Sequence, residues 1–313
     1  MTISQRKVVT TAIIIIFTGI GILFVTQGFG GENKSRKAAS INDSNDIYRS
    51  YKLPDSASFA GEIMPLKNFD TRESLEREII TTAYRHSSTI LIIKRATRYF
   101  PVIEKILREN NIPDDFKYLA VAESDLSNMV SPVGATGFWQ IMPETGREEG
   151  MEINTEVDER YYIEKSTSFA CEYFLKSYAK YGNWTLAAAS YNGGRNGIDD
   201  QIEIQHEKNY YDLLLSEETA RYIFRVVAYK LIITDPAAYG FEISNNQLYP
   251  EIRFHEVKVD TAVTELSNFA RKFGTNYKLL KLLNPWLRKP YLTNKTGKTY
   301  VIKIPVEGFR IGD

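Results

Sequence analysis

The sequence predicts a mostly α-helical domain followed by a small module of two strands and two helices. Through the middle of the chain, apolar residues recur at helical spacing, as Leu75, Ile79 and Ala83 do. After Pro236 the periodicity changes, and short alternating runs typical of strands flank new helical stripes. We therefore expect two folding units after an N-terminal segment of different character.

The first 68 residues are expected to lie outside both units. Val8 to Thr26 is a run of 19 uncharged residues, about the length needed to cross a bilayer. Arg6 and Lys7 precede it, which favours a cytoplasmic segment 1–7. Thr26-Gln27-Gly28 is a poor cleavage site, which favours a retained transmembrane signal anchor over 8–26. A cleaved signal peptide is the alternative. Residues 27–68 are polar and aperiodic, so they are expected to form a tether.

This arrangement gives an expected location in the cell envelope. A retained anchor would hold the protein in the inner membrane, facing the periplasm, and a cleaved signal would release it into the periplasm. The membrane is therefore an expected partner through the N-terminal helix.

The helical domain is expected to span residues 69–245. Asp70 and Glu73 have the spacing of a capping box at the start of its first helix. Further helices are expected at 101–108, 113–123, 165–181, 184–191 and 217–233.

The C-terminal module is expected to span residues 250–307. Residues 254–259 alternate like a strand, residues 263–270 and 277–283 carry helical stripes, and residues 299–305 form a second strand. Because this βααβ unit has its own apolar stripes and follows a polar break, we expect it to hold an independent core.

Composition excludes several function classes. Lys+Arg and Asp+Glu both number 39, so no nucleic-acid partner is indicated. His86, His206 and His255 lie far apart and Cys171 is the single cysteine, in an apolar helical context. We expect no metal site and no cofactor, and Cys171 to be a core residue.

Glu123 is the most informative single residue. Phe116, Leu119 and Ala120 form one apolar helix face, and Glu123 is the next position on that face. A carboxylate there is either paired with an arginine or a backbone N–H, or it does chemistry in an apolar setting that raises its pKa. Spacing alone leaves these alternatives open.

The segment after Glu123 favours chemistry on sugars. A turn-rich stretch, Ser131 to Gly137, leads into Phe138-Trp139-Gln140-Ile141-Met142. Aromatic rings and amides can hold N-acetylated sugars, since sugar faces stack on rings and amides satisfy their polar groups. The alternative is an ordinary turn that packs Trp139 into the core.

These motifs resemble those of the soluble lytic transglycosylase, or goose-type lysozyme-like, family. The match comprises Glu123-Ser124, the SPVGATGFWQIMP run at 131–143 and the ASYNGG run at 189–194, within a resemblance over roughly 98–240. The residues of these motifs are similar to those of the membrane-bound lytic murein transglycosylase D branch of the family. Phe138 stands where the family usually has Leu or Met. The resemblance implies an α+β, lysozyme-like fold.

The resemblance implies that Glu123 is the catalytic acid for peptidoglycan glycan strands. It would protonate the oxygen between N-acetylmuramic acid and N-acetylglucosamine, then take a proton from the muramoyl C6 hydroxyl as a 1,6-anhydro ring closes. The nearest second carboxylate, Asp125, is turned ~200° from Glu123 on a helix, so it is expected to face solvent or cap the loop. The substrate-binding residues implied are Ser131, Gly137, Phe138, Trp139, Gln140, Met142, Tyr191, Asn192, Glu218 and Tyr222.

Individual roles follow from motif position. Ser131 and Gln140 are expected to bond the sugar, Tyr191 to orient Glu123 through its hydroxyl, and Tyr222 to line the cleft. Asn192 and Glu218 are as well explained by structural hydrogen bonds.

The C-terminal module resembles LysM, a binder of N-acetylglucosamine chains, although Val259-Asp260-Thr261-Ala262 replaces the usual Gly-Asp-Thr-Leu. The alternative is a packing appendage without a ligand. For the whole chain, a water-using muramidase and a non-catalytic peptidoglycan-binding protein remain as alternatives.

Overall fold

The computed structural model describes residues 50–308 and 310. The expected cytoplasmic segment, the expected anchor over 8–26 and the first part of the expected tether lie outside these residues. Among the described helices, none has the length and apolar character needed to cross a membrane.

Residues 50–68 are packed against the domain, so the expectation of a tether reaching residue 68 is wrong. Strands β1 (Ser58–Phe59) and β2 (Glu62–Ile63) form a short hairpin, and Phe59 and Met64 are buried in the core. The segment gave no sequence signal because its apolar residues follow neither the helix nor the strand period.

The hairpin also caps a distant helix. The Glu62 carboxylate accepts hydrogen bonds from the backbone N–H groups of Trp184 (2.6 Å) and Thr185 (2.8 Å), at the start of α7. A carboxylate at this end of a helix satisfies N–H groups that have no partner within the helix and opposes the helix dipole.

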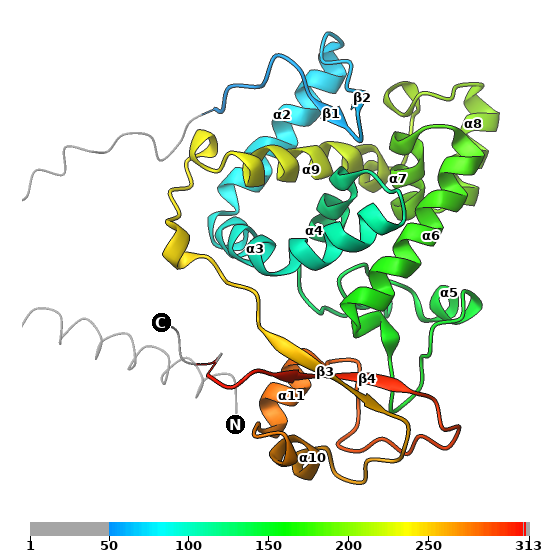
Figure 1. Cartoon of the computed structure of the whole chain (residues 1–313). Helices are drawn as coiled ribbons and strands as arrows, with labels where there is room; N and C mark the ends of the chain where they lie inside the picture. The colour runs from blue at the N-terminus through cyan, green and yellow to red at the C-terminus, as the bar shows by residue number, and fades with distance from the viewer. Residues whose placement is uncertain (1–49, 309, 311–313) are drawn as a thin grey trace, which may run out of the picture. The chain divides into compact units, whose positions relative to one another are not determined.

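Helices form most of the first domain, as expected (Figure 1). The α-helices are α2 (Phe69–Tyr84), α3 (His86–Glu109), α4 (Lys117–Ser124), α5 (Pro143–Glu148), α6 (Ile163–Tyr181), α7 (Trp184–Gly193), α8 (Arg195–Gln205) and α9 (Glu217–Thr234). Single 3₁₀ turns occur at Asp114–Phe116, Glu159–Tyr161, Tyr210–Asp212, Ala237–Tyr239 and Asn245–Gln247.

Two local predictions need correction. Helix α2 begins at Phe69 after the N-cap residue Asn68, which makes no side-chain capping bond, so the Asp70–Glu73 capping box is not formed. Helix α3 is far longer than expected and contains Pro101, because its apolar face continues on both sides of the proline.

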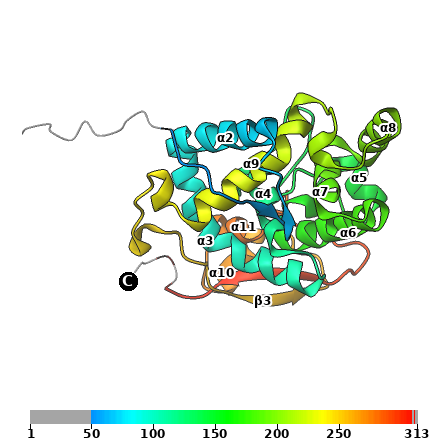
Figure 2. The same cartoon turned by 90° about the horizontal axis from the view of Figure 1, so that it is seen from above.

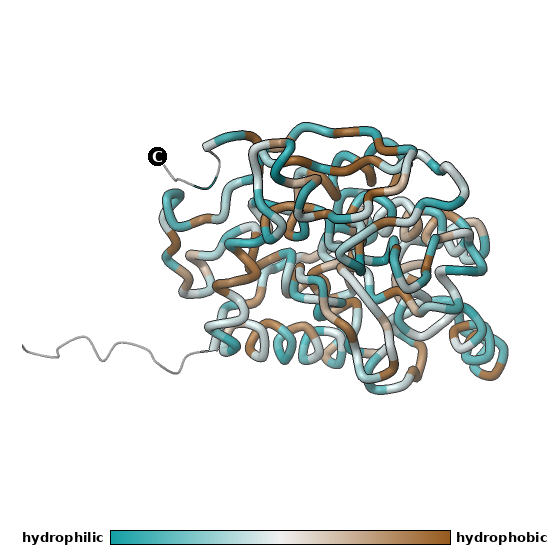
Figure 3. The backbone as a smooth tube through the Cα atoms, turned by 90° about the horizontal axis from the view of Figure 1, so that it is seen from below, coloured by the Kyte–Doolittle hydropathy of each residue, from teal (hydrophilic) through white to brown (hydrophobic). Residues whose placement is uncertain are grey.

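Helix α4 lies at the centre of the core, against α9 and α3 (Figures 1 and 2). Leu119, Ala120 and Val121 have no exposed surface. A helix of eight residues is marginal by itself, so α4 depends on this packing. The surrounding helices alternate apolar and polar stretches, as one-sided packing requires (Figure 3).

The C-terminal module has the predicted βααβ order. Strands β3 (Phe254–Val259) and β4 (Tyr300–Pro305) pair antiparallel, with Val257 opposite Ile302, and enclose α10 (Leu266–Lys272) and α11 (Tyr277–Leu283). Its core is not independent, however. Val157 and Tyr161 of the helical domain belong to the same buried cluster as Trp286 and Ile302.

We expect Glu62→Ala to destabilise the protein by about 1–2 kcal/mol, because the N–H groups of Trp184 and Thr185 lose their acceptor while the N-cap Asn183 remains. Thermal denaturation should show a melting temperature lower by roughly 3–6 °C. Glu73→Ala, at an exposed position on α2, is the control and should leave the melting temperature unchanged. An equal effect of both changes would contradict the capping role.

Candidate active site

Glu123 lies one residue before the end of α4 and faces α9. The hydroxyl of Tyr222, a buried residue of α9, donates a hydrogen bond of 2.6 Å to Glu123 Oε1. Glu123 keeps part of its surface open to solvent, although protein atoms enclose it on most sides. An acid in this setting is largely desolvated and can still be reached from solvent.

The pKa of Glu123 is raised to about 7. Burial is the main cause, since desolvation disfavours the carboxylate, and the charge of Glu218 adds to it. The hydrogen bond from Tyr222 and the charge of Arg225 act in the opposite direction. The predicted raising of the pKa by apolar surroundings is confirmed, and Glu123 is half protonated near neutral pH.

The positive charge of Arg225 is offset by carboxylates on two sides. Its guanidinium donates to Glu218 (2.8 Å) and lies 3.6 Å from Glu78, a carboxylate with 1% of its side chain exposed. Arg221 also pairs with Glu78, at 2.8 Å. Because these partners offset its charge, Arg225 favours ionisation of Glu123 less than a lone arginine would. Glu218, expected to bind substrate, has its carboxylate engaged by Arg225.

Asp125 caps the end of α4 instead of facing the cleft. It has the left-handed backbone conformation (φ 50°), and its backbone N–H donates to Val121 O. Its carboxylate accepts from Arg85 at 3.0 Å. Asp125 was expected to face solvent or to cap the loop; instead its backbone caps α4, and its partly buried carboxylate pairs with Arg85.

The loop of residues 128–141, called here the active-site loop, follows α4. Ser131 Oγ accepts from Ala135 N (3.0 Å), and Gln140 Nε2 donates to Gly137 O (2.9 Å) and Met129 O (3.2 Å). Both side chains were expected to bond the sugar. In the structure they bond the loop's own backbone and fix its shape.

Phe138 and Trp139 are buried, with 3% and 0% of their surface exposed. Trp139 Nε1 donates to Thr167 Oγ1 (2.9 Å), and Phe138 packs edge-on against Tyr99. The expectation that these rings stack on sugars is wrong, because both rings point into the core. The alternative drawn from the sequence, a turn that packs Trp139 inside, is the one observed.

The roles expected of Tyr191 and Tyr222 are exchanged. The Tyr191 hydroxyl donates to Trp139 O at 2.7 Å and so supports the active-site loop, whereas Tyr222 is the tyrosine that touches Glu123. Asn192 Oδ1 accepts from Thr219 Oγ1 (3.0 Å), which links α7 to α9 as the structural reading predicted.

Several predicted residues line two pockets that share Asn192. One pocket, of about 940 Å³, is lined by Gln140, Met142, Tyr191 and Asn192, and the other, of about 800 Å³, by Asn192 and Glu218. Met142 is exposed. Met129 and Val130 of the active-site loop are also exposed, at 50% and 57%.

Gly137 and Arg160 form a close contact that the sequence did not reveal. A Cβ at Gly137 would lie 2.1 Å from Arg160 O, and Gly137 has a φ of 84°. The Arg160 guanidinium donates to Gly134 O (2.9 Å) and Ile141 O (3.1 Å). Arg160 therefore holds the active-site loop through two hydrogen bonds, and its backbone lies close against Gly137.

No group of three or more His, Cys, Asp or Glu residues in the described part of the chain could hold a metal ion. Cys171 is buried, as expected, and burial raises the pKa of its thiol to about 12. The thiol is therefore a packing group.

We expect Gly137→Ala to destabilise the protein by at least about 2 kcal/mol more than Gly134→Ala. Both glycines have a positive φ, but a Cβ at Gly134 meets nothing within 4 Å, so Gly134→Ala should incur only about 1 kcal/mol of backbone strain. Chemical denaturation of the two variants measures the difference. Equal losses would show that the approach of Arg160 does not constrain the loop.

Comparison with known proteins agrees with this geometry. Residues 100–214 match the transglycosylase SLT domain family, and residues 255–308 match the soluble lytic transglycosylase C-terminal LysM-like domain family.

Two curated relatives are named membrane-bound lytic murein transglycosylase D, from Escherichia coli strains K12 and O6:H1 (CFT073). Each is 24% identical over 258 residues, covering 79% of this chain and 55% of the relative. The chain thus spans about half the length of the curated relatives it matches. It carries a transglycosylase SLT domain joined to a LysM-like domain of the kind found at the C-terminus of soluble lytic transglycosylases.

Proposed function

We propose that this chain is a lytic transglycosylase that cleaves peptidoglycan glycan strands. The bond broken is the β-1,4 bond between N-acetylmuramic acid and N-acetylglucosamine, and the product carries a 1,6-anhydromuramoyl end. The observation that carries the proposal is a single acid, Glu123, with a pKa of about 7 and a tyrosine hydroxyl on one oxygen.

The first step uses the acid form of Glu123. Because Oε1 accepts from Tyr222, Oε2 is the oxygen that presents the proton to the glycosidic oxygen. As the C1–O bond breaks, the N-acetyl carbonyl oxygen of the muramoyl residue bonds to C1, and the N-acetylglucosamine end leaves as an alcohol.

The second step uses the carboxylate form. Glu123 takes the proton of the muramoyl C6 hydroxyl while that oxygen attacks C1 and displaces the N-acetyl oxygen. The 1,6-anhydro ring closes, Glu123 is protonated again, and no water is consumed. A pKa near the working pH suits a group that must first donate and then accept a proton.

The surroundings of Glu123 favour this route over one with two carboxylates. A retaining glycosidase holds its second carboxyl about 5 Å away, and an inverting enzyme roughly 6.5–9.5 Å away with room for water. The neighbouring candidates, Asp125 and Glu218, are each engaged by an arginine. A nucleophile supplied by the substrate itself removes the need for either.

The substrate groove is proposed to follow the two pockets that share Asn192, because their lining residues Tyr191 and Glu218 are close enough to Glu123 to interact with its charge. Gln140, Met142, Tyr191, Asn192 and Glu218 line these pockets and can contact the strand. Ser131, Gly137, Phe138 and Trp139 are proposed to build the active-site loop that borders the groove.

We also propose that the protein acts in the cell envelope, held at the membrane by residues 8–26. The uncharged run there and the printed name of the relatives, membrane-bound murein enzymes, support this location.

Glu123→Gln should lower turnover on purified sacculi by at least about 100-fold while the fold is kept, because an amide cannot donate or accept the proton. Glu217→Gln, which changes a carboxylate of the same helix as Tyr222 with 81% of its side chain exposed, is the matched comparison and should retain most activity. Turnover by Glu123→Gln at the wild-type rate would overturn the assignment.

The same substitution should change stability with a definite pH dependence. Folding raises the pKa of Glu123 from 4.5 to about 7. The contribution of Glu123 to the free energy of unfolding is therefore fully present below pH 4.5 and is lost as the pH rises through 7. At pH 8, Glu123→Gln should therefore be more stable than the wild type, by up to roughly 3 kcal/mol before solvent screening. At pH 4 the two should unfold alike.

Products released from sacculi should be one water lighter than hydrolytic muropeptides, as measured by mass spectrometry. Reducing ends in place of anhydro ends would establish the water-using muramidase. Binding without release of fragments would establish the non-catalytic alternative.

Tyr222→Phe should move the alkaline limb of the activity profile to higher pH. The lost hydrogen bond had stabilised the carboxylate, so the pKa of Glu123 rises further and the acid form persists to higher pH. Tyr118→Phe removes a hydroxyl that bonds Thr234 Oγ1 and should leave the limb in place. A shift in the opposite direction for Tyr222→Phe would contradict the contact.

A further inference from the structure

We propose that the LysM-like module is a structural part of the active site. It holds residues 152–164, called here the bridging segment, and Asp158 and Arg160 of that segment hold the active-site loop in place. The proposal concerns positioning residues, and only its kinetic test rests on the proposed function.

The module continues its backbone hydrogen bonding onto the bridging segment. Asp158 N donates to Trp286 O (2.9 Å), and Arg288 N donates to Glu156 O (2.7 Å). Between these bonds, Val157 pairs with Leu287 as an antiparallel bridge. A flexible appendage would not share such a ladder.

Charged and polar side chains fasten the same contact. Lys298 Nζ lies 2.7 Å from Glu152 and 3.3 Å from Glu159, and the Tyr300 hydroxyl donates to Glu152 at 3.0 Å. Lys303, with 7% of its side chain exposed, pairs with Glu164. Because Lys303 is mostly desolvated, loss of its partner would leave an unpaired buried charge.

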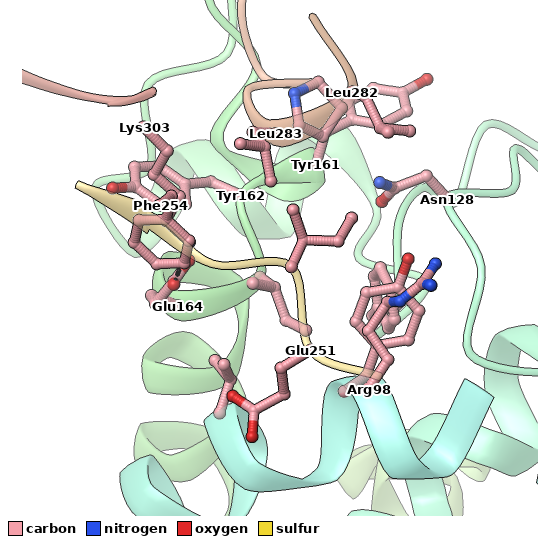
Figure 4. A pocket seen from close by; sticks show the side chains of 16 residues that line it. Arg98, Asn128, Tyr161, Tyr162, Glu164, Glu251, Phe254, Leu282, Leu283 and Lys303 are labelled. Carbon is pink, nitrogen blue, oxygen red and sulfur yellow. Dashed lines mark hydrogen bonds and ion pairs between the residues drawn. The ribbon is translucent and has the colours of Figure 1, made fainter. Parts of the chain in front are cut away.

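Aromatic rings fill the junction. Tyr162 stacks on Trp286 with ring centres 5.4 Å apart and an interplanar angle of 8°, and Trp286 stacks in turn on Tyr300 at 5.7 Å. Figure 4 shows Tyr161, Tyr162 and Glu164 around one pocket with the module's Phe254 and Lys303. Such stacks are favourable only in a narrow range of geometries, so they fix the relative placement of the rings.

Asp158 joins the module to the loop. Its backbone is bound by Trp286, and its carboxylate binds the Arg160 guanidinium through two bonds, Nε–Oδ1 at 2.9 Å and Nη2–Oδ2 at 2.8 Å. The remaining nitrogen of Arg160 donates to Gly134 O and Ile141 O. Both side chains are about 10% exposed, which makes the bidentate pair stronger and its loss more costly.

The loop in turn touches the helix that carries Glu123. Ser124 Oγ donates to Phe138 O (2.9 Å), and Tyr191 donates to Trp139 O (2.7 Å). Displacement of the loop would therefore disturb the end of α4 and admit water beside Glu123. A continuous set of bonds runs from the module, through Asp158 and Arg160, to the residue after Glu123.

The test uses the full-length chain and three variants. Lys298→Met/Tyr300→Phe changes only the module's side of the contact with Glu152. Arg160→Lys keeps the charge but cannot bind Asp158 and two carbonyls at once. Glu265→Gln is the control, because its partner Asn268 lies within the module.

Hydrogen exchange of the loop amides is the first measurement. We expect the amides of Thr136, Gly137 and Ile141, which are bonded within the loop, to exchange at least about 10-fold faster in both test variants and unchanged in the control. Unchanged exchange in the module-side double variant would overturn the proposal. If Arg160→Lys does not fold, the double variant decides alone.

Kinetics on short soluble glycan strands is the second measurement. We expect kcat to fall about 5-fold or more with KM within about 2-fold, and the alkaline limb of the profile to move to lower pH as water lowers the pKa of Glu123. An increase in KM alone, with kcat and the alkaline limb of the pH–activity profile unchanged, would assign the module to glycan binding and overturn the positioning role. An inactive wild type would refute the proposed function, while the exchange data would still decide this inference.

Discussion

The contact between Glu123 on α4 and Tyr222 on α9 is the constraint around which the domain is arranged. A carboxyl that stays protonated near neutral pH needs a site where desolvation outweighs the groups that favour its charge. Apolar residues of α4 supply the desolvation, whereas Tyr222 and Arg225 oppose it. The pairing of Arg225 with Glu78 and Glu218 keeps that opposition limited. The ion pairs of α9 thus matter for the acid as well as for packing.

A short buried helix cannot hold such a site without help from distant parts of the chain. The Glu62 hairpin caps α7, α7 presents Tyr191 to the active-site loop, and Arg160 ties that loop to residues bound by the LysM-like module. Each tie joins segments far apart in sequence. Because the C-terminal module takes part in these ties, its core includes Val157 and Tyr161 of the catalytic domain.

The features that depend on residue spacing along the chain could be predicted from the sequence. Helical spacing placed Glu123 on an apolar helix face, and strand patterns located both strands of the module. Ring orientation was not predictable, because aromatic residues suit a groove and a core equally well, and Trp139 proved to be in the core. The choice between Tyr191 and Tyr222 depends on how α7 and α9 cross α4. The hairpin at 58–63 and the contacts of Arg160 are likewise set by tertiary packing, which the periodicity of apolar residues does not reveal.

The protonation state of Glu123 is the most direct test of this account. Infrared difference spectra between the wild type and Glu123→Gln, recorded in heavy water across the pH range, isolate the carboxyl band of this one residue. The account predicts the carbonyl band of a protonated acid at pH 6, replaced by the carboxylate bands with a midpoint of about 7. A carboxylate already complete at pH 6, with a midpoint near the ordinary value of 4.5, would contradict it.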